Sequence, residues 1–392
     1  AIGMMKAGKI PPEQVLSLEN SACPSCGSCA FLGTANTMGC LTEALGMSLP
    51  GSALVPATYA ERLRIAYESG IKICELAEKN IKPRDIMTAE AIRNGIKVAM
   101  AICGSTNAVL HLSAIAYEAE LDMNILDEFD KLSKITPQIA KVNPSAKWDM
   151  EDFHRAGGIP RVMKNLGNLL DLGVMTCTGK TLGENLSEYQ FLYEENSEII
   201  KTPEAPFSET GGIAVLRGNL APNTGITKPG AFDKSLHHFV GKAKVFNSEE
   251  EANEAILAGK IEHGDVVVIR YEGPKGGPGM REMYKAMKYL YGMGLNKTTA
   301  LITDGRFSGT NNGCFVGHIS PEAAEGGPIA IVEDGDEIEI DVAAGKIELL
   351  ISEEEIQNRL KKLVPVKKEI PRGYLQVYAR LASSADKGAV IL

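Results

Sequence analysis

The chain has 392 residues, of which 44% are hydrophobic and 6% aromatic, and its formal net charge at pH 7 is −9. A single core rarely grows past about 300 residues, so this length predicts two domains in an ordinary globular protein. The acidic balance argues against nucleic acid as a partner. No apolar run approaches the length of a membrane span and the N-terminus has no secretory pattern, so we expect no membrane partner. An anionic substrate would need a local cation, and a bound metal ion is the simplest source.

The eight cysteines do not resemble the disulfide framework of a small secreted protein. We therefore expect a reducing, cytoplasmic location. The first residue is Ala1 rather than Met, and the residues that follow it have no start-like pattern. We expect the sequence to begin inside a longer chain.

The first domain, predicted at residues 1–200, reads as mainly helical. Apolar residues recur at helical spacing, and Thr58 with Glu61 fits a capping box. The predicted helices cover residues 34–47, 58–79, 89–102, 105–120, 127–134 and 150–170. Few strands are predicted here, which is unusual for an α/β domain unless its strands lie upstream.

The second domain, predicted at residues 201–392, combines strands with helices. A linker is expected at 196–208, where Pro203 and Pro206 interrupt regular structure. The predicted strands cover residues 211–218, 265–270 and 298–303, with a hairpin at 337–351 and helices at 248–258 and 281–292. This alternation predicts a mixed sheet or a small barrel flanked by helices, and therefore an α/β fold class.

A serine follows one of the predicted buried strands. Asp304-Gly305 ends the strand, and Ser308 then lies in a polar loop flanked by Gly309 and Gly313 that would allow close approach to a ligand. A serine at the carboxyl end of a strand is well placed for chemistry. The alternative is a tight turn with a capping serine.

Three cysteines form the pattern C-x2-C-x2-C at Cys23, Cys26 and Cys29. This spacing indicates one soft metal or cluster, although a fourth ligand for zinc or for a ferredoxin-type cluster is missing nearby. A redox C-x-x-C pair is a further alternative. Ordinary buried thiols are expected elsewhere, at positions 40, 74, 103, 177 and 314.

A glycine-rich loop at 272–281 resembles a phosphate cradle without matching a known nucleotide motif, and its amides could bind an anion. Glu282 is predicted in the first turn of the following helix. It could balance the helix dipole or act as an oxygen ligand for Mg²⁺. His154 is expected to be a satisfied surface or core histidine, and 104–107 could bind an anion or cap a helix.

Taken together, these segments resemble the dihydroxy-acid dehydratase / phosphogluconate dehydratase family. The similarity runs from Glu19 to Val390. The matching stretches are 23–29, 34–38, 43–51, 104–107, 154–158, 271–282 and 301–309. The resemblance implies an α/β/α domain, here its helix-rich remainder, followed by a barrel-like domain with flanking helices, and a homodimer.

The resemblance also implies roles for single residues. Cys29 matches a ligand of an iron–sulfur cluster ([2Fe-2S] or [4Fe-4S]), Glu282 a Mg²⁺ ligand, and Ser308 the catalytic base. Cys23 and Cys26 fall at positions that the family does not use as ligands, against the local three-cysteine pattern. The family's Cys-Asp-Lys motif, which carries a further cluster cysteine and a metal ligand, is absent from this sequence.

The implied reaction dehydrates a small 2,3-dihydroxy acid to a 2-oxo acid. In it, Ser308 removes the C2 proton, Mg²⁺ holds the carboxylate, and an open cluster iron takes the C3 hydroxyl. The C-terminal 374–390 favours 2,3-dihydroxy-3-methylbutanoate, in branched-chain amino-acid synthesis. A sugar-acid dehydratase, or an inactive fragment that acts as a binding subunit, is the alternative. Since this sequence resembles a family member without its N-terminal part, we expect these residues alone to be inactive and metal-poor.

Overall fold

The computed structural model describes residues 1–22, 26–364 and 366–392, in two compact units. The described residues between 26 and 213 form one unit, which we name the helical unit. The described residues of 1–22 join 214–392 in the other, which we name the sheet unit. The predicted domain limits of 1–200 and 201–392 stay a prediction.

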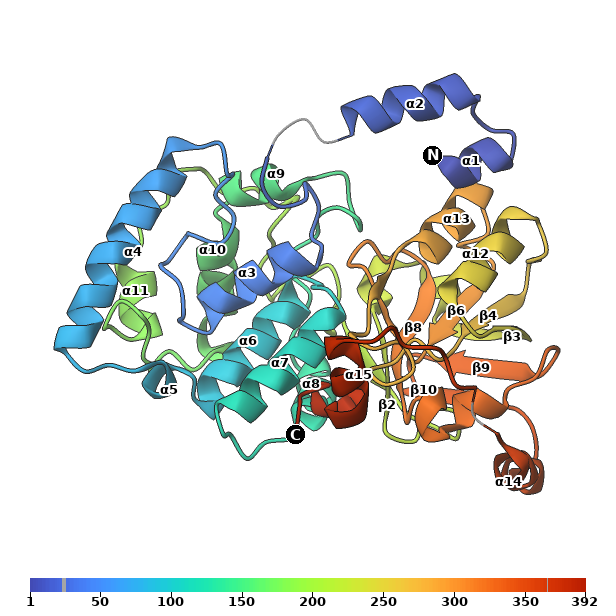
Figure 1. The fold of residues 1–392 in the computed structure, drawn as a ribbon. Helices are drawn as coiled ribbons and strands as arrows, with labels where there is room; N and C mark the ends of the chain where they lie inside the picture. The colour runs from blue at the N-terminus through green and yellow to red at the C-terminus, as the bar shows by residue number, and fades with distance from the viewer. Residues whose placement is uncertain (23–25, 365) are drawn as a thin grey trace. The chain divides into compact units, whose positions relative to one another are not determined.

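The helical unit consists of helices joined by loops, drawn in blue, cyan and green in Figure 1. Its helices are α3 (Thr34–Ala44), α4 (Ala60–Glu78), α5 (Pro83–Ile86), α6 (Ala89–Ala101), α7 (Asn107–Glu118), α8 (Ile125–Ser133), α9 (Met150–Arg155), α10 (Gly158–Leu166) and α11 (Leu182–Glu188). Helix α6 lies at the centre because Ile92, Ile96 and Met100 recur at helical spacing and are completely buried. Thr88 begins it, since its hydroxyl accepts a hydrogen bond from the amide of Ala91 at 3.2 Å.

Three local predictions for this unit are wrong. The predicted helix 150–170 is broken at Gly157, whose φ of +104° is left-handed and therefore suits glycine. The predicted capping box does not form, because Tyr59 is the N-cap of α4 and makes no side-chain capping bond. The predicted linker is packed, since Ile199 and Ile200 are buried.

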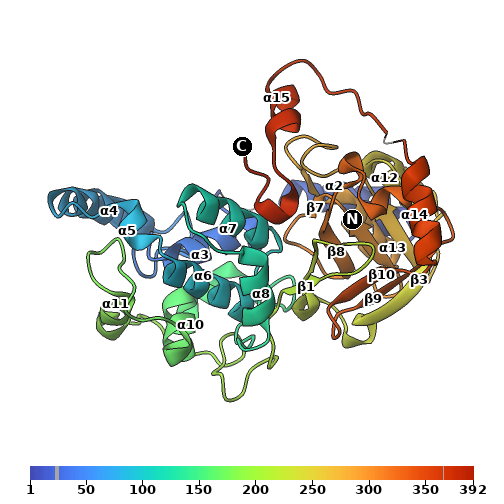
Figure 2. The same cartoon turned by 90° about the horizontal axis from the view of Figure 1, so that it is seen from below.

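The sheet unit is built on an eight-stranded mixed sheet in the order β1-β2-β8-β6-β4-β3-β9-β10. The strands are β1 (Ala214–Leu216), β2 (Thr224–Thr227), β3 (His238–Phe246), β4 (Asp265–Ile269), β6 (Ala300–Thr303), β8 (Cys314–Ser320), β9 (Glu337–Asp341) and β10 (Lys346–Leu349). The four central strands are parallel and the outer ones antiparallel. A bridge from Arg217, next to β1, to Lys346 in β10 nearly closes the sheet into a barrel, whose curvature Figure 2 shows. The expected α/β class with a barrel-like mixed sheet is confirmed.

Two apolar cores line the two faces of this sheet. Val266 and Val268 of β4 face one core, and Val267 and Ile269 face the other, so this central strand is buried on both sides. Helices α12 (Glu249–Leu257) and α13 (Lys285–Met293) cover the second core. The sheet unit's remaining helices are α1 (Ile2–Lys6), α2 (Pro12–Ser21), α14 (Glu353–Lys362) and α15 (Tyr374–Leu381).

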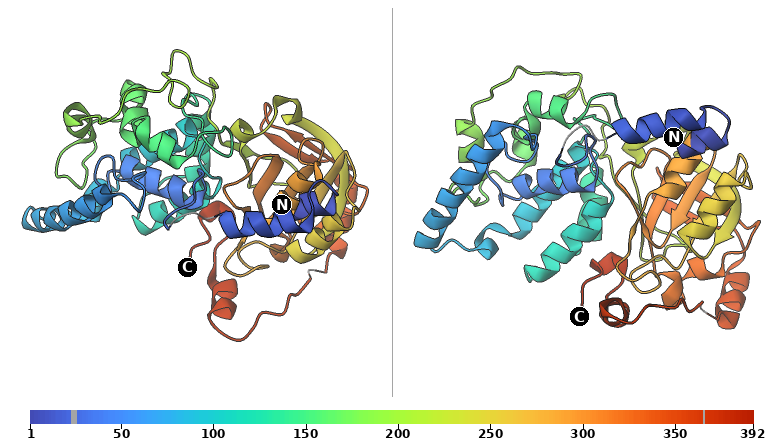
Figure 3. Two further views of the ribbon diagram at one scale, coloured as in Figure 1. Left: turned by 90° about the horizontal axis from the view of Figure 1, so that it is seen from above. Right: turned by 45° about the horizontal axis from the view of Figure 1, so that its top comes forward.

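The N-terminal helix α1 packs on α13, as Figure 3 shows. The two helices approach closely because glycines meet at the contact: a Cβ on Gly3 would lie 2.8 Å from the carbonyl oxygen of Tyr289. No helix among the described residues is long and apolar enough to cross a membrane.

The predicted helix 281–292 begins later than expected. Helix α13 starts at Lys285, and the residues before it form β5 (Glu282–Met283), a short strand. Strand β5 pairs in parallel with β7 (Arg306–Phe307) in a separate two-stranded sheet. Glu282 is therefore a strand residue, and the placement in a first helical turn is wrong.

Candidate functional site

The small β5–β7 sheet brings two of the predicted site residues together. Glu282 pairs with Arg306 and Met283 with Phe307, and the amide of Ser308 donates to the carbonyl of Met283 at 2.9 Å. Met283 and Phe307 are buried in a core, whereas Glu282, Arg306 and Ser308 are only partly buried. Because side chains alternate along a strand, these three lie on the face opposite the core. The face therefore carries a carboxylate, a guanidinium and a hydroxyl.

Asp304 fixes the loop that leads to this face. It is completely buried, and its carboxylate accepts hydrogen bonds from the amides of Tyr271 at 3.0 Å, Glu272 at 3.0 Å and Ala323 at 2.9 Å. Burial raises the pKa of Asp304, and the three amides oppose that rise. One side chain thus ties the ends of β4 and β6 to the segment that follows β8.

The glycine-rich loop is held from inside by a second buried carboxylate. Glu322 accepts hydrogen bonds from the amides of Lys275 and Gly276, both at 2.8 Å. Burial, together with the charge of Asp304, raises the pKa of Glu322 to about 7. A Cβ on Gly273 would lie 2.6 Å from this carboxylate, so a larger residue there would have to displace Glu322. The anion that these two amides bind is therefore a side chain of the chain itself, which differs from the expected external ligand.

The carboxylate at the N-terminus of α13 is that of Glu249 and not that of Glu282. The carboxylate of Glu249 accepts hydrogen bonds from the amides of Lys285 at 3.0 Å and Tyr284 at 3.2 Å. Glu272 completes this network, because its Oε1 accepts from the amide of Glu249 at 3.1 Å and from Lys368 Nζ at 3.1 Å. The helix-dipole alternative for Glu282 is therefore wrong.

Arg306 places its own positive charge beside Ser308. Its Nε donates a hydrogen bond to the carbonyl of Met280 in the glycine-rich loop. Burial lowers the pKa of Arg306, and the nearby charges of Glu282 and Tyr378 oppose that shift. Tyr378 belongs to α15, so the C-terminal helix also borders this face.

In the helical unit, Cys29 lies exposed on the loop before α3. Asn36 holds this loop, since its Nδ2 donates to the carbonyls of Cys29 and Phe31, both at 2.7 Å. Cys26 is also a free, exposed thiol, and Cys23 lies outside the described residues. The structure therefore keeps Cys29 accessible, as a ligand must be.

The predicted polar motif 104–107 packs against the start of the same helix. Ser105 Oγ lies 3.1 Å from Thr34 Oγ1, and Asn107 Nδ2 donates to Thr34 Oγ1 at 2.9 Å. Thr106, the N-cap of α7, makes no side-chain capping bond. Two sequence motifs thus meet at the N-terminus of α3, next to the Cys29 loop.

The described residues include no group of three or more His, Cys, Asp or Glu side chains that could hold a metal ion. Cys29 and Glu282 each fit by chemical type, as a thiolate for iron and a carboxylate for Mg²⁺. Each would supply one ligand of a larger set. Among the cysteines expected to be buried, Cys74 is exposed and Cys177 partly so, which differs from the expectation.

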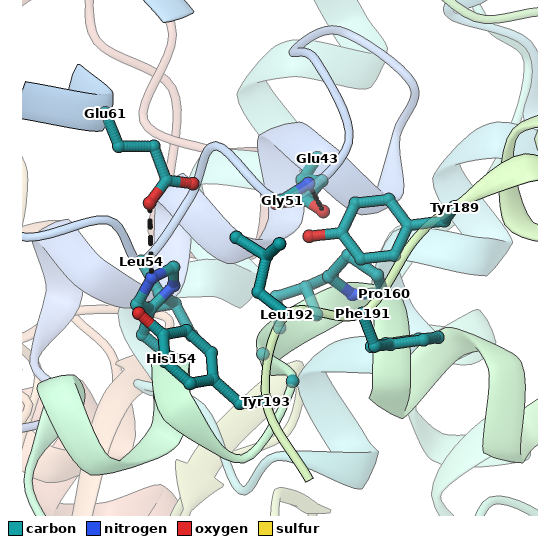
Figure 4. A pocket seen from close by; sticks show the side chains of 13 residues that line it. Glu43, Gly51, Leu54, Glu61, His154, Pro160, Tyr189, Phe191, Leu192 and Tyr193 are labelled. Atoms are coloured by element: carbon teal, nitrogen blue, oxygen red, sulfur yellow. Dashed lines mark hydrogen bonds and ion pairs between the residues drawn. The ribbon is translucent and has the colours of Figure 1, made fainter. Parts of the chain in front are cut away.

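A small pocket in the helical unit contains ionisable groups but none of the predicted site residues (Figure 4). It encloses about 20 Å³, room for roughly one water. Glu43 accepts hydrogen bonds from the amides of Gly51 at 2.7 Å and Ala53 at 3.0 Å, and burial raises its pKa to about 7. His154 is buried with its Nε2 3.7 Å from Glu61, and burial lowers its pKa. These contacts brace the turn before α4.

Comparisons with known proteins match nearly the whole chain. The sequence model described as "Dihydroxy-acid/6-phosphogluconate dehydratase N-terminal" matches residues 1–185, and the corresponding C-terminal model matches residues 198–389. The chain belongs to the dihydroxy-acid/6-phosphogluconate dehydratase family. The suspected resemblance is thereby confirmed.

Curated relatives of this family member are named dihydroxy-acid dehydratase. The protein from Caldanaerobacter subterraneus subsp. tengcongensis is 52% identical over 392 residues, which are 100% of this chain and 70% of the relative. The proteins from Acetivibrio thermocellus and Pyrococcus furiosus are each 52% identical over 393 residues, with the same shares covered. The resemblance thus spans both units.

Sequence reasoning missed the side chains that build the site around Ser308. Asp304 was read as part of a turn, and Glu322 and Glu249 were not singled out. Their signal is weak, because acidic residues are common and the partners of Asp304 lie 19 to 33 positions away. Arg306 lies within the matching stretch 301–309, but nothing in the local sequence indicated that its positive charge is accessible.

Proposed function

We propose that this protein removes water from a 2,3-dihydroxy carboxylic acid to give a 2-oxo acid, as a hydro-lyase. The proposed substrate is 2,3-dihydroxy-3-methylbutanoate, which places the protein in branched-chain amino-acid biosynthesis. The observation that carries the proposal is the shared face of Glu282, Arg306 and Ser308 on the β5–β7 sheet. The family membership supports it independently.

Ser308 would act as the base. It takes the proton from C2, the electron pair forms a double bond between C2 and C3, and the C3 hydroxyl leaves with a proton as water. The resulting enol then becomes the 2-oxo acid. Serine is a weak base, so positive charge near it must favour the alkoxide, and Arg306 is a cation of this chain on the same face. The 2.9 Å hydrogen bond from the Ser308 amide to the carbonyl of Met283 fixes the backbone that carries this hydroxyl.

We further propose an iron–sulfur cluster with Cys29 as one ligand, and Mg²⁺ with Glu282 as one ligand. When bound, these groups would supply Lewis-acid stabilisation of oxygen charge. A homodimer and a cytoplasmic location belong to the same proposal.

The test is formation of a 2-oxo acid by the purified protein supplied with iron, sulfide and Mg²⁺. Product would be detected by NMR in D₂O after addition of 2,3-dihydroxy-3-methylbutanoate, with a sugar acid of the aldonate class in a parallel reaction. Selective conversion of the branched acid would support the proposal and overturn the expectation that these residues alone are inactive. Conversion of the aldonate alone would contradict the proposed substrate, and conversion of neither would confirm that expectation and contradict the proposed activity of this chain.

A further inference from the structure

Arg306 differs from two other partly buried arginines of the sheet unit, Arg270 and Arg359, in how its guanidinium is used. Arg270 donates to Asn247 at 2.8 Å and to the carbonyls of Ala330 at 2.6 Å and Val332 at 3.0 Å. Arg359 pairs with Asp336 at 2.6 Å and Glu355 at 2.8 Å. The guanidinium groups of Arg270 and Arg359 are therefore bound by other groups of the protein.

The guanidinium of Arg306 is occupied at one nitrogen. Its Nε donates to Met280, and within the described part of the chain its two terminal nitrogens make neither a hydrogen bond nor an ion pair. The side chain is only partly buried, so solvent reaches it. The charge of Glu282 acts on this cation, and a ligand anion at the terminal nitrogens would further offset the cost of burying it.

The glycine-rich loop fixes the orientation of the Arg306 guanidinium. Met280 is buried and has a positive φ of 45°, which only a constrained loop would impose. The loop is itself anchored through Glu322 at Lys275 and Gly276. Because Nε is bound to the Met280 carbonyl, the planar group cannot rotate freely. Both terminal nitrogens are thereby left for one further partner.

We propose that Arg306 binds the carboxylate of the acid substrate through its two terminal nitrogens, alongside the proposed Mg²⁺, an inference that rests on the proposed function. The planar fork of arginine matches the two oxygens of a carboxylate. Ser308 lies two residues further along the same face, so a carboxylate bound there presents its C2 carbon toward the base. The guanidinium is also a local positive charge in a chain whose net charge of −9, Arg306 included, would otherwise repel an acid.

The experiment measures binding, which needs no turnover. The probes are 3-methyl-2-oxobutanoate, a 2-oxo acid of the proposed product class, and its methyl ester, titrated calorimetrically into the protein and its variants. Arg306→Gln should weaken binding of the acid by about 10- to 100-fold, because a hydrogen-bonded charge is lost. Binding of the ester should change by less than about threefold. Arg306→Lys, which keeps the charge but not the fork, should fall between the two.

The control is Arg372→Gln, which removes an exposed arginine from the same unit and should leave both titrations unchanged. Thermal unfolding of each variant checks the fold, and Arg306→Lys decides the matter if Arg306→Gln does not fold. Equal weakening of acid and ester, an unchanged acid affinity in Arg306→Gln, or no acid binding by the wild type would overturn the proposal. An aldonate that binds through Arg306 without dehydration of the branched acid would support the subsite and contradict the proposed substrate.

Discussion

The two units hold their candidate site residues in different ways. In the sheet unit, the carboxylates of Asp304 and Glu322 are buried and bind backbone amides, so the face with Ser308 is fixed by several loops at once. In the helical unit, the exposed Cys29 lies on a loop held by Asn36. The difference teaches that the fold of the sheet unit fixes the face with Ser308 through buried contacts, whereas the Cys29 loop keeps a thiol exposed. Each region can therefore be disturbed by its own kind of substitution.

The largest expected effect concerns the thiol. Cys29→Ser should abolish iron and sulfide binding, because serine is a poor ligand for iron. Cys26→Ser, a matched change on the same exposed loop, should leave both contents unchanged, and the same is predicted for Cys23→Ser. Iron and sulfide assays on the reconstituted proteins give the answer. Equal loss in all three variants would favour the local three-cysteine site.

The next effect concerns the carboxylate that ties the sheet unit together. Asp304→Ala removes the acceptor of three buried amides and should lower the free energy of unfolding by about 3 kcal/mol or more. Asp341→Ala is the control, since Asp341 accepts from one exposed amide, that of Ala344. Urea unfolding measures both. Similar losses in the two variants would show that Asp304 does not fix the loops.

A further effect is the pH dependence of the helical unit. Burial raises the pKa of Glu43 from 4.5 to about 7 in the folded state. The folded state therefore binds its proton more tightly than the unfolded chain does. The stabilisation by that proton is complete below about pH 4.5 and disappears as the pH rises towards 7, a loss of up to roughly 3 kcal/mol.

Thermal unfolding of wild type and Glu43→Gln between pH 5 and 8 tests this dependence. The variant, which stays neutral, should lose less stability over that interval. Glu68→Gln, an exposed change on α4, serves as the control. A pH profile in Glu43→Gln that matches the wild type would refute the role given to Glu43.

The smallest effect concerns Glu282. Glu282→Gln should weaken Mg²⁺ binding by about tenfold or more, since even changes beyond the metal's direct ligands cost that much. The cluster content should stay the same. Calorimetric titration with Mg²⁺ measures the affinity. The control is Glu250→Gln, which removes an exposed carboxylate that pairs with Arg281 at 2.7 Å. Unchanged Mg²⁺ affinity would remove Glu282 from the metal site.

Sequence patterns predicted local features better than contacts between distant segments. The strand before Asp304 was found because its residues are β-branched and apolar, and the hairpin 337–351 because charged and apolar residues alternate. Glu282 was placed in a helix because the apolar spacing of α13 extends back to it. Its pairing with Arg306 is 24 positions away along the chain and leaves no periodic signal.

The candidate site shows the same division. Ser308 was found from glycines beside a strand end, which is a local signal. The carboxylates that hold its surroundings bind amides of remote loops, so their roles depend on the closed sheet and not on neighbours in sequence. Arg306 was visible in the recognised stretch, but its accessible terminal nitrogens could be found only in three dimensions.

The most direct test of the central claim is the rate of 2-oxo acid formation by Ser308→Ala. The account predicts a rate lower by about two to four orders of magnitude, because the base is lost. Cluster content, Mg²⁺ affinity and thermal stability should be unchanged. Ser235→Ala, at an exposed position of the same unit, should keep the wild-type rate. Retention of more than about a tenth of that rate by Ser308→Ala would contradict the claim, since another group would then remove the proton.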